Sequence, residues 1–401
     1  MSIEINLNNF FNHFLKKDHK QIFDKYLKIC NDVSAKLKSE IDSNQIEIFN
    51  SISQNYQSKI FSLRNSLDRS PKKLIIGIGG SSAGIKSFVK YTNQEYLFID
   101  NLNYSLIENI LNNKNILDYS IYVISKSGNT FETLAALNLL YQYANKMGLL
   151  KKLFLQMTCI TEEGDNYLYN FAKKHNIRII KHNKKIGGRY SFFSETGILP
   201  LNLNETDVFD NCKYNNFLGD DHKSAIINSA VILTIQETKK ISKYVNLFYD
   251  EKLKYFGEWF NQLHAESLGK KNKGLTPMYS ICPRDHHSMA QLYLDGPKDN
   301  YFTVYPPENI SNFSKFEKLN FLNIENQTPK ELILSQYNAI QKVFIEQNLP
   351  FRTISIGENN LNIFQLYLYF FLETIILGKA QNINPYDQPA VEAIKIKTLK
   401  D

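Results

Sequence analysis

Apolar residues follow a regular alternation along most of this chain. From residue 69 to 205, apolar runs of strand length alternate with stretches whose apolar residues recur every three or four positions, as in a helix. Five strands are predicted there, at residues 73–76, 96–100, 120–125, 153–161 and 177–180. Strict alternation of strand and helix is typical of a parallel sheet with helices on both faces.

The same alternation returns in residues 206–401. Strands are predicted there at residues 245–250, 278–282, 301–306 and 351–357. Helical segments such as FQLYLYFFLETIILGKA separate them. The pattern therefore predicts an α/β protein with two tandem α/β/α sandwich domains, residues 69–205 and 206–401, each with a doubly wound, mainly parallel sheet. Ligands of such folds bind at the carboxyl ends of the strands, so we expect a crevice between the two sets of strand ends.

Residues 1–68 have a different pattern and are predicted to form a helical N-terminal arm. Segments such as QIFDKYLKIC and IEIFNSISQNYQSKIFSLRNSL repeat apolar residues at helical spacing. A DNA-binding helix-turn-helix is the alternative interpretation. The segments are long and evenly charged, which favours a packing arm without chemistry of its own.

Composition narrows the class of protein. The 401 residues carry a formal net charge of +7, which suits a small anionic substrate, and they lack the concentrated basic stripe of nucleic-acid-binding proteins. The four cysteines are scattered without a CxxC pair, as in reduced cytosolic proteins. We find no secretion signal and no segment long enough to span a bilayer. We therefore expect a soluble, cytoplasmic protein with neither nucleic-acid nor membrane partners.

Two loops in the first predicted domain are suited to an anion. GIGGSSAG (77–84) follows a strand, and its glycines let backbone N–H groups approach an anion at a helix N-terminus. It nearly matches the dinucleotide fingerprint GxGxxG, but Ser82 occupies the third glycine position. SKSGNTFET (125–133) also follows a strand and opens a helix. Ser125, Ser127 and Thr130 offer three hydroxyls beside helix N–H groups, more than a simple N-cap requires, and Lys126 adds a positive charge.

Two further segments carry candidate cations, and in the second Lys397 and Lys400 lie close enough to Lys395 to blur the choice of lysine. GGRYS (187–191) places Arg189 in a glycine-led loop, where it either pairs with a structural carboxylate or faces a reacting group. DQPAVEAIKIK (387–397) opens the last predicted helix, with Gln388 near its start and Lys395 nearly two turns further on. By itself Lys395 is interpreted as a solvated lysine favoured by the helix dipole.

The segment EWFNQLHAESLGKKNKGLTPMYSICPRDHHSMAQLYLDG (258–296) combines few but specific polar residues. Gln262 and Glu266 lie one turn apart on a predicted helix, and His286 and His287 follow a predicted strand. Strand ends are where α/β proteins keep their chemistry. The alternative is a solvated helix face and two loop histidines without a role.

Taken in order, these segments resemble the phosphoglucose isomerase (glucose-6-phosphate isomerase) family in its short bacterial form, which has the sugar isomerase (SIS) fold. The resemblance runs from about residue 70 to the C-terminus. It is carried by the Gln-x-x-x-Glu helix, a histidine some twenty residues further on, GGRYS and the C-terminal DQxxVExxK. Spacing selects His287 over His286, although His286 stays open.

The resemblance also implies roles for individual residues. It assigns catalysis to Glu266, His287, Lys395 and Arg189. It assigns substrate binding to Gly80, Ser81, Ser125, Lys126, Ser127, Thr130, Gly188, Gln262 and Gln388. The implied reaction is the reversible isomerisation of D-glucose 6-phosphate to D-fructose 6-phosphate by ring opening and a cis-enediolate proton transfer, with no metal and no organic cofactor.

The resemblance further implies a homodimer in which His287 completes the neighbouring chain's pocket. Two alternatives remain open. One is another phosphosugar isomerase, such as a dual glucose/mannose 6-phosphate isomerase. The other is a non-catalytic phosphosugar-binding regulator, which would need a DNA-binding module and could dispense with Glu266 or Arg189.

Overall fold

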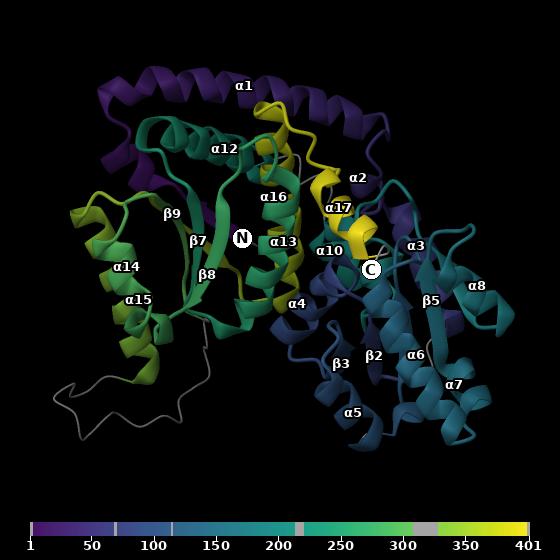
Figure 1. Cartoon of the computed structure of the whole chain (residues 1–401). Coiled ribbons are helices and arrows are strands. Elements are labelled where there is room, and N and C mark those ends of the chain that lie inside the picture. The colour runs from purple at the N-terminus through teal and green to yellow at the C-terminus, as the bar shows by residue number, and fades with distance from the viewer. Residues whose placement is uncertain (1–2, 68–69, 114, 213–219, 308–327, 399–401) are drawn as a thin grey trace. The chain divides into compact units, whose positions relative to one another are not determined.

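The computed structural model describes residues 3–67, 70–113, 115–212, 220–307 and 328–398. The chain forms two compact units. We call Ser39–Tyr214 the continuous unit, and Met1–Lys38 together with Asn215–Asp401 the discontinuous unit. Each unit contains one five-stranded sheet (Figure 1).

The sheet of the continuous unit is entirely parallel, with the order β3-β2-β4-β5-β6. Its strands are β2 (Lys73–Ile76), β3 (Tyr96–Ile99), β4 (Ser120–Ile124), β5 (Met157–Thr161) and β6 (Arg178–Lys181). The helices of this unit are α2 (Glu47–Asn50), α3 (Gln54–Leu67), α4 (Ala83–Tyr91), α5 (Tyr104–Asn113), α6 (Phe131–Lys146), α7 (Leu150–Gln156), α8 (Tyr167–Lys174), α9 (Glu195–Ile198) and α10 (Glu205–Asn211). All residues of β2 and β4 are buried, as expected for strands covered on both faces.

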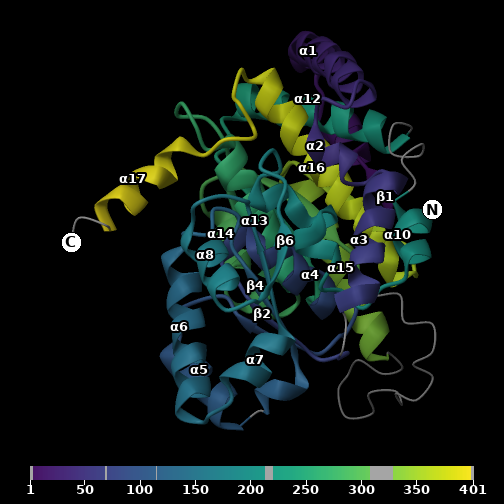
Figure 2. The same ribbon diagram turned by 90° about the vertical axis from the view of Figure 1, so that its right-hand side faces the viewer.

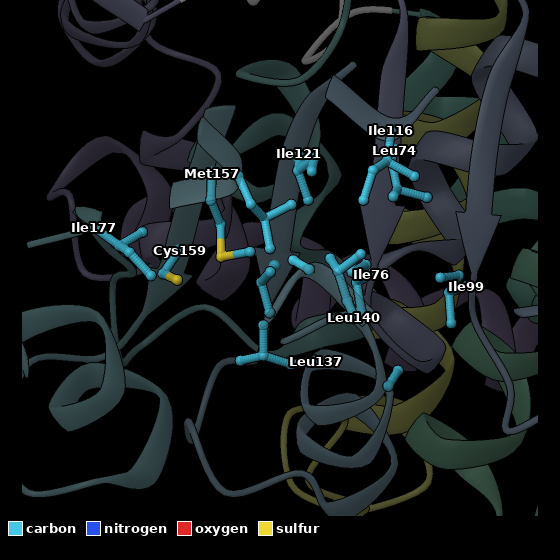
Figure 3. Packing of buried hydrophobic residues seen from close by; sticks show 14 of the residues in the cluster. Leu74, Ile76, Ile99, Ile116, Ile121, Leu137, Leu140, Met157, Cys159 and Ile177 are labelled. Carbon is cyan, nitrogen blue, oxygen red and sulfur yellow. The ribbon is translucent and has the colours of Figure 1, made fainter. Parts of the chain in front are cut away.

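One face of this sheet packs against an apolar cluster (Figure 3). Leu74 and Ile76 of β2 and Val123 of β4 contribute to it from the sheet, and Leu137 and Leu140 contribute from α6. The i, i+3 spacing on α6 matches the face that it turns to the sheet. Because the five strands are parallel, their carboxyl ends lie along one edge, and the loops that leave this edge carry the predicted site residues.

The sheet of the discontinuous unit has the order β1-β10-β9-β7-β8. Its strands are β1 (Ile3–Asn6), β7 (Lys243–Phe248), β8 (Thr276–Ile281), β9 (Asn300–Tyr305) and β10 (Phe351–Ile356). Strand β1 is antiparallel to β10, with Ile3 opposite Ile356, and the other pairs are parallel. The helices are α12 (Asp220–Lys239), α13 (Lys254–Leu268), α14 (Ala290–Asp295), α15 (Pro329–Glu346), α16 (Ile363–Ala380) and α17 (Pro389–Thr398).

Helices cover both faces of this second sheet (Figure 1). On one side Phe344 of α15 stacks on Phe302 of β9, with ring centroids 4.4 Å apart. On the other side α13 and α16 pack together, and Trp259 meets Tyr367 edge to face at 4.6 Å. Helix α1 (Lys17–Asp42) runs beside α12 in both views (Figures 1 and 2). These layers confirm the predicted α/β class.

The N-terminal region differs from the predicted helical arm. Residues 3–6 form a strand, and the compact units divide at residues 38/39 and 214/215 instead of 68/69 and 205/206. The alternating IEIN pattern supplies an edge strand that only the distant β10 can pair, so local helical periodicity could not reveal it. The predicted strand at 153–161 is also wrong in its first half, where LKKLFLQ forms α7 and only MTCIT is strand.

Helix α16 corrects the expectation that no segment could span a bilayer. Within the described ranges, Asn360–Ala380 is long and apolar enough to do so. However, 83% of its apolar window is buried inside the protein. Packing against α12 and α13 accounts for this composition, because a helix that is apolar all round fits the centre of a fold.

A buried polar network crosses the discontinuous unit beneath α13. Arg352 and Glu373 form an ion pair at 2.6 Å, and both side chains are fully buried. Tyr244 and Tyr369 also hydrogen-bond to Arg352. His264 of α13 is fully buried beside this network, with its ring edge to face against Tyr244.

Candidate functional site

The loop after β2 approaches the GGR loop closely. Gly79–Ser81 form a 3₁₀ turn, and a Cβ added to Gly80 would lie 2.2 Å from the carbonyl carbon of Gly188. Only glycine permits this approach of two backbones. Gly80, Ser81, Gly188 and Arg189 are therefore brought together, as expected for one site.

The loop after β4 carries the predicted phosphate-binding hydroxyls. Ser125 and Thr130 hydrogen-bond to each other at 2.9 Å, and the Ser127 hydroxyl accepts from the Asn129 N–H at 3.3 Å. The turn passes through Gly128, whose φ is +67° and where an added Cβ would lie 1.7 Å from Asn166. Helix α6 starts directly afterwards, so its first N–H groups border these hydroxyls.

Two cations of the continuous unit are close enough to influence each other. Partial burial lowers the pKa of the Lys126 ammonium, the carboxylate of Glu162 at 3.9 Å opposes this, and the charge of Arg189 adds to the lowering. Arg189 is buried, with only 2% of it exposed. Like charges held together in this way favour the binding of an anion.

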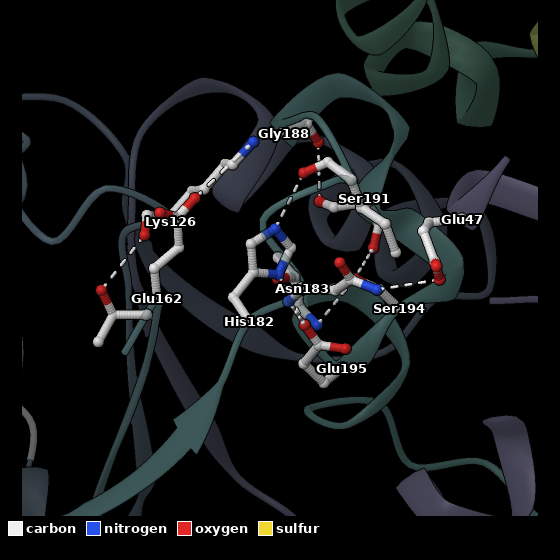
Figure 4. A network of polar contacts seen from close by, with 12 residues as sticks. Glu47, Lys126, Glu162, His182, Asn183, Gly188, Ser191, Ser194 and Glu195 are labelled. Carbon is white, nitrogen blue, oxygen red and sulfur yellow. Dashed lines mark hydrogen bonds and ion pairs between the residues drawn. The ribbon is translucent and has the colours of Figure 1, made fainter. Parts of the chain in front are cut away.

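The buried pair His182–Glu195 lies next to the GGR loop (Figure 4). His182, directly after β6, hydrogen-bonds to Glu195 at 2.7 Å and to the Ile186 carbonyl at 3.1 Å. Burial alone would raise the pKa of Glu195, but hydrogen bonds from His182 and Tyr56 hold it below its usual range. Sequence analysis missed this pair, because its residues are thirteen positions apart and match no motif.

Helix α13 of the discontinuous unit positions the predicted base. Trp259, Phe260 and Leu263 are buried on one face, as their spacing predicts. Gln262 donates its amide to the Glu266 carboxylate at 3.1 Å. The predicted stripe of these two polar residues is thus confirmed as a direct contact.

Glu266 and Gln388 line one cavity of about 820 Å³ within the discontinuous unit. Its walls are the end of α13, the lysine-rich loop at 269–273 and the turn before α17. Residues far apart in sequence, 266 and 388, are therefore brought together as the resemblance implies. Lys395 lies on α17 as predicted, but its side chain is outside the described part of the structure.

The two adjacent histidines have different surroundings. His286 is half-buried, and its Nε2 lies 2.7 Å from the hydroxyl of Tyr249. His287 is exposed at the end of the 3₁₀ turn after β8. The geometry thus occupies His286 within its own unit and leaves His287 accessible. The choice of His287 over His286 therefore stays a prediction.

All four cysteines are buried and free, as expected for core thiols. Among the described residues, His, Cys, Asp and Glu side chains form no group of three that could hold a metal ion.

The fold and the loops of the site define a two-unit α/β protein of the sugar isomerase type. A crystal structure of a hypothetical protein from Thermus thermophilus matches with a TM-score of 0.83 and 20% identity, covering 99% of both chains. A glucose-6-phosphate isomerase from Chlamydia trachomatis matches with a TM-score of 0.72 and 17% identity, over 89% of this chain and 74% of that one. These similarities establish the fold.

The sequence comparisons identify the family. The phosphoglucose isomerase family model matches residues 68–276. The glucose-6-phosphate isomerase of Methanocaldococcus jannaschii is 32% identical over 82% of this chain and 84% of the relative. A probable glucose-6-phosphate isomerase of Methanococcus maripaludis is 31% identical over 80% of this chain and 76% of the relative. The chain belongs to the phosphoglucose isomerase family.

Proposed function

We propose that this chain catalyses the reversible isomerisation of D-glucose 6-phosphate and D-fructose 6-phosphate. The observation that carries the proposal is the hydrogen-bonded pair Gln262–Glu266 on the wall of a cavity shared with Gln388, in a chain of this family. A carboxylate at such a wall can abstract a proton from a bound sugar. Family membership specifies which sugar phosphate it acts on.

In this proposal the continuous unit binds the phosphate. Ser125, Ser127 and Thr130 present hydroxyls at the start of α6, and the Gly80–Ser81 turn adds backbone N–H groups. Helix N-termini favour anions because their first N–H groups lack partners within the helix. Holding the phosphate far from the reacting carbons lets its binding energy align them.

Glu266 is the proposed base that carries the proton between C2 and C1. Removing the C2 proton from the open-chain aldose leaves a cis-enediolate, and returning the proton to C1 gives the ketose. Arg189 stabilises the negative charge on the enediolate oxygens, because a guanidinium offers a positive charge and several planar N–H donors. Gln262 and Gln388 orient the substrate hydroxyls and the carboxylate.

Ring opening requires a proton acceptor and a proton donor, and we assign this step to His287 with Lys395. Since His287 is exposed at a turn, a second copy of the chain can receive it in its cavity. We therefore propose a homodimer in which each His287 completes the partner's pocket. We also propose that the enzyme works in the cytoplasm, where its four free thiols would stay reduced.

The test is a coupled assay with fructose 6-phosphate as substrate and no added metal. Formation of glucose 6-phosphate is expected, and mannose 6-phosphate formation is followed in parallel. Mannose 6-phosphate produced at a comparable rate would establish a dual isomerase instead. Binding of the sugar phosphate without either product would point to the regulator.

A further inference from the structure

The loop that follows the Glu266 helix contains three lysines that contact one distant stretch of backbone. Lys271 donates to the Asn382 carbonyl at 3.2 Å, and Lys273 donates to the Gln381 carbonyl at 2.8 Å. These carbonyls belong to the C-cap residue of α16 and to the residue after it, and lysines commonly bind carbonyls at a helix C-terminus. These two lysines therefore need no explanation beyond helix capping.

Lys270 makes a different set of contacts. Its ammonium donates to the Asn384 carbonyl at 2.5 Å, to the Asp387 carbonyl at 2.6 Å and to the Asp387 carboxylate at 2.7 Å. Only 12% of its side chain is exposed. All three acceptors lie past the end of α16, in the turn that leads into α17.

The turn that Lys270 contacts also contains hydrogen bonds between its own residues. Asn384 accepts from the Tyr386 N–H at 3.0 Å and donates to the Asp387 carboxylate at 2.9 Å. The next residue is Gln388, which lines the same cavity as Glu266. Lys270 also follows Glu266 by only one helical turn. One ammonium thus connects the end of the base-bearing helix to the residue before Gln388.

We propose that Lys270 is a positioning residue that fixes the 384–388 turn, and with it Gln388, relative to Glu266. The Asp387 side chain is 51% exposed, but Lys270 itself is largely covered and makes two further hydrogen bonds to backbone carbonyls, which an isolated surface ion pair lacks. A displacement of about 1 Å in a substrate-positioning group can reduce turnover about a hundredfold. The inference rests on the proposed isomerase function.

The experiment compares Lys270→Met with Lys298→Met in the full-length protein. Methionine keeps the aliphatic stem of the lysine and removes the donor. Lys298 is an exposed control lysine that donates to the Leu294 carbonyl and to the Gln347 side chain, and it does not line the cavity of Glu266. We expect kcat/KM to fall about 10- to 100-fold in Lys270→Met. It should change less than about twofold in Lys298→Met.

A double-mutant cycle with Gln388→Ala then separates positioning from a general loss of stability. If Lys270 acts through Gln388, the double variant loses little more activity than Gln388→Ala alone. Losses that multiply would overturn the proposal, and so would wild-type kinetics in Lys270→Met.

Amide hydrogen exchange supplies a readout that does not need activity. Lys270→Met should accelerate exchange in residues 384–391 while α13 keeps its protection. If wild-type protein shows no isomerase activity, the proposed function fails, and the exchange result still decides whether Lys270 holds the turn. Unchanged exchange at 384–391 overturns the positioning role whatever the activity.

Discussion

The side-chain amide of Gln262 donates a hydrogen bond of 3.1 Å to the carboxylate of Glu266, one turn further along α13. Glu266 also lies on the wall of the cavity that Gln388 lines. A carboxylate that is already oriented loses less conformational entropy on reaching the transition state of proton transfer. The hydrogen bond from Gln262 therefore contributes to the orientation of the proposed base.

We expect Glu266→Gln to reduce kcat by about a hundredfold or more, because an amide cannot act as a general base. Phosphate binding and the far-UV spectrum should be unchanged. The measurement is isomerase turnover together with hydrogen–deuterium exchange at substrate C2. Glu258→Gln, on the same helix but exposed, serves as the matched control and should behave as wild type. Exchange at the wild-type rate in Glu266→Gln would assign the base elsewhere.

Removing two hydroxyls of the loop after β4, in Ser127→Ala with Thr130→Ala, should mainly raise KM. The phosphate is bound alike in the ground and transition states, so kcat should change little. Loss of hydrogen bonds to a charged group predicts an increase in KM of at least about tenfold. Steady-state kinetics and the affinity for inorganic phosphate check this. The exposed Ser62→Ala on α3 is the control, and equal affinities in both proteins would remove the loop from the site.

Mixing two inactive variants tests the shared pocket. After mild dissociation and reassembly, His287→Ala and Glu266→Gln subunits should recover a fraction of wild-type activity. One pocket of each heterodimer then carries both lesions and the other carries none. No recovery would place both residues in one chain's pocket.

A second mixture of variants and a variant of the neighbouring histidine serve as controls. Glu266→Gln mixed with Arg189→Ala should stay inactive, because the proposal places both residues in the same chain's pocket. His286→Ala alone should retain more activity than His287→Ala, since His286 is already occupied by Tyr249. Equal losses of activity in His286→Ala and His287→Ala would contradict the assignment of ring opening to His287 alone.

The buried His264 predicts a dependence of stability on pH. Burial, followed by the charge of Arg352, lowers the pKa of His264 to about 3. The unfolded chain has a histidine pKa of about 6.5, so below that pH the unfolded state binds the extra proton and gains stability. Lowering the pH from 7.5 to 5.0 should therefore reduce the free energy of unfolding by about 2 kcal/mol through this residue.

Urea unfolding of wild type and of His264→Phe at both pH values measures this effect. Phenylalanine fills the space between Tyr244 and Phe260 without a titrating group. The decrease in unfolding free energy on acidification should be smaller in the variant. Equal decreases in both proteins would mean that folding does not lower the pKa of His264.

Most strands and helices could be predicted because their periodicity is local. The buried runs KLII and SIYVI and the amphipathic α13 each reveal their environment within a few residues. Strand β1 could not be predicted in this way, because it pairs with β10, which lies far from it along the chain. The boundary between α7 and β5 was missed because an apolar run alone does not separate the two states.

The residues of the candidate site also differ in whether local sequence reveals them. Glycine-rich and hydroxyl-rich loops indicate an anion site from sequence, and the structure groups Gly80 with Gly188 and Ser125 with Thr130. The roles of Lys270 and of the His182–Glu195 pair depend on contacts between segments without a shared motif. A lysine in a lysine-rich loop looks like any solvated lysine until its acceptors are known.

The pairing of β1 with β10 sets an order for the events of protein synthesis. The continuous unit leaves the ribosome complete while most of the discontinuous unit is still unmade, and domains generally fold as units as they emerge. Ile3 and its neighbours are translated before the continuous unit, yet their partner strand is translated after it. The nascent chain must therefore carry β1 unpaired while the whole continuous unit is made, and during this interval a chaperone could bind it.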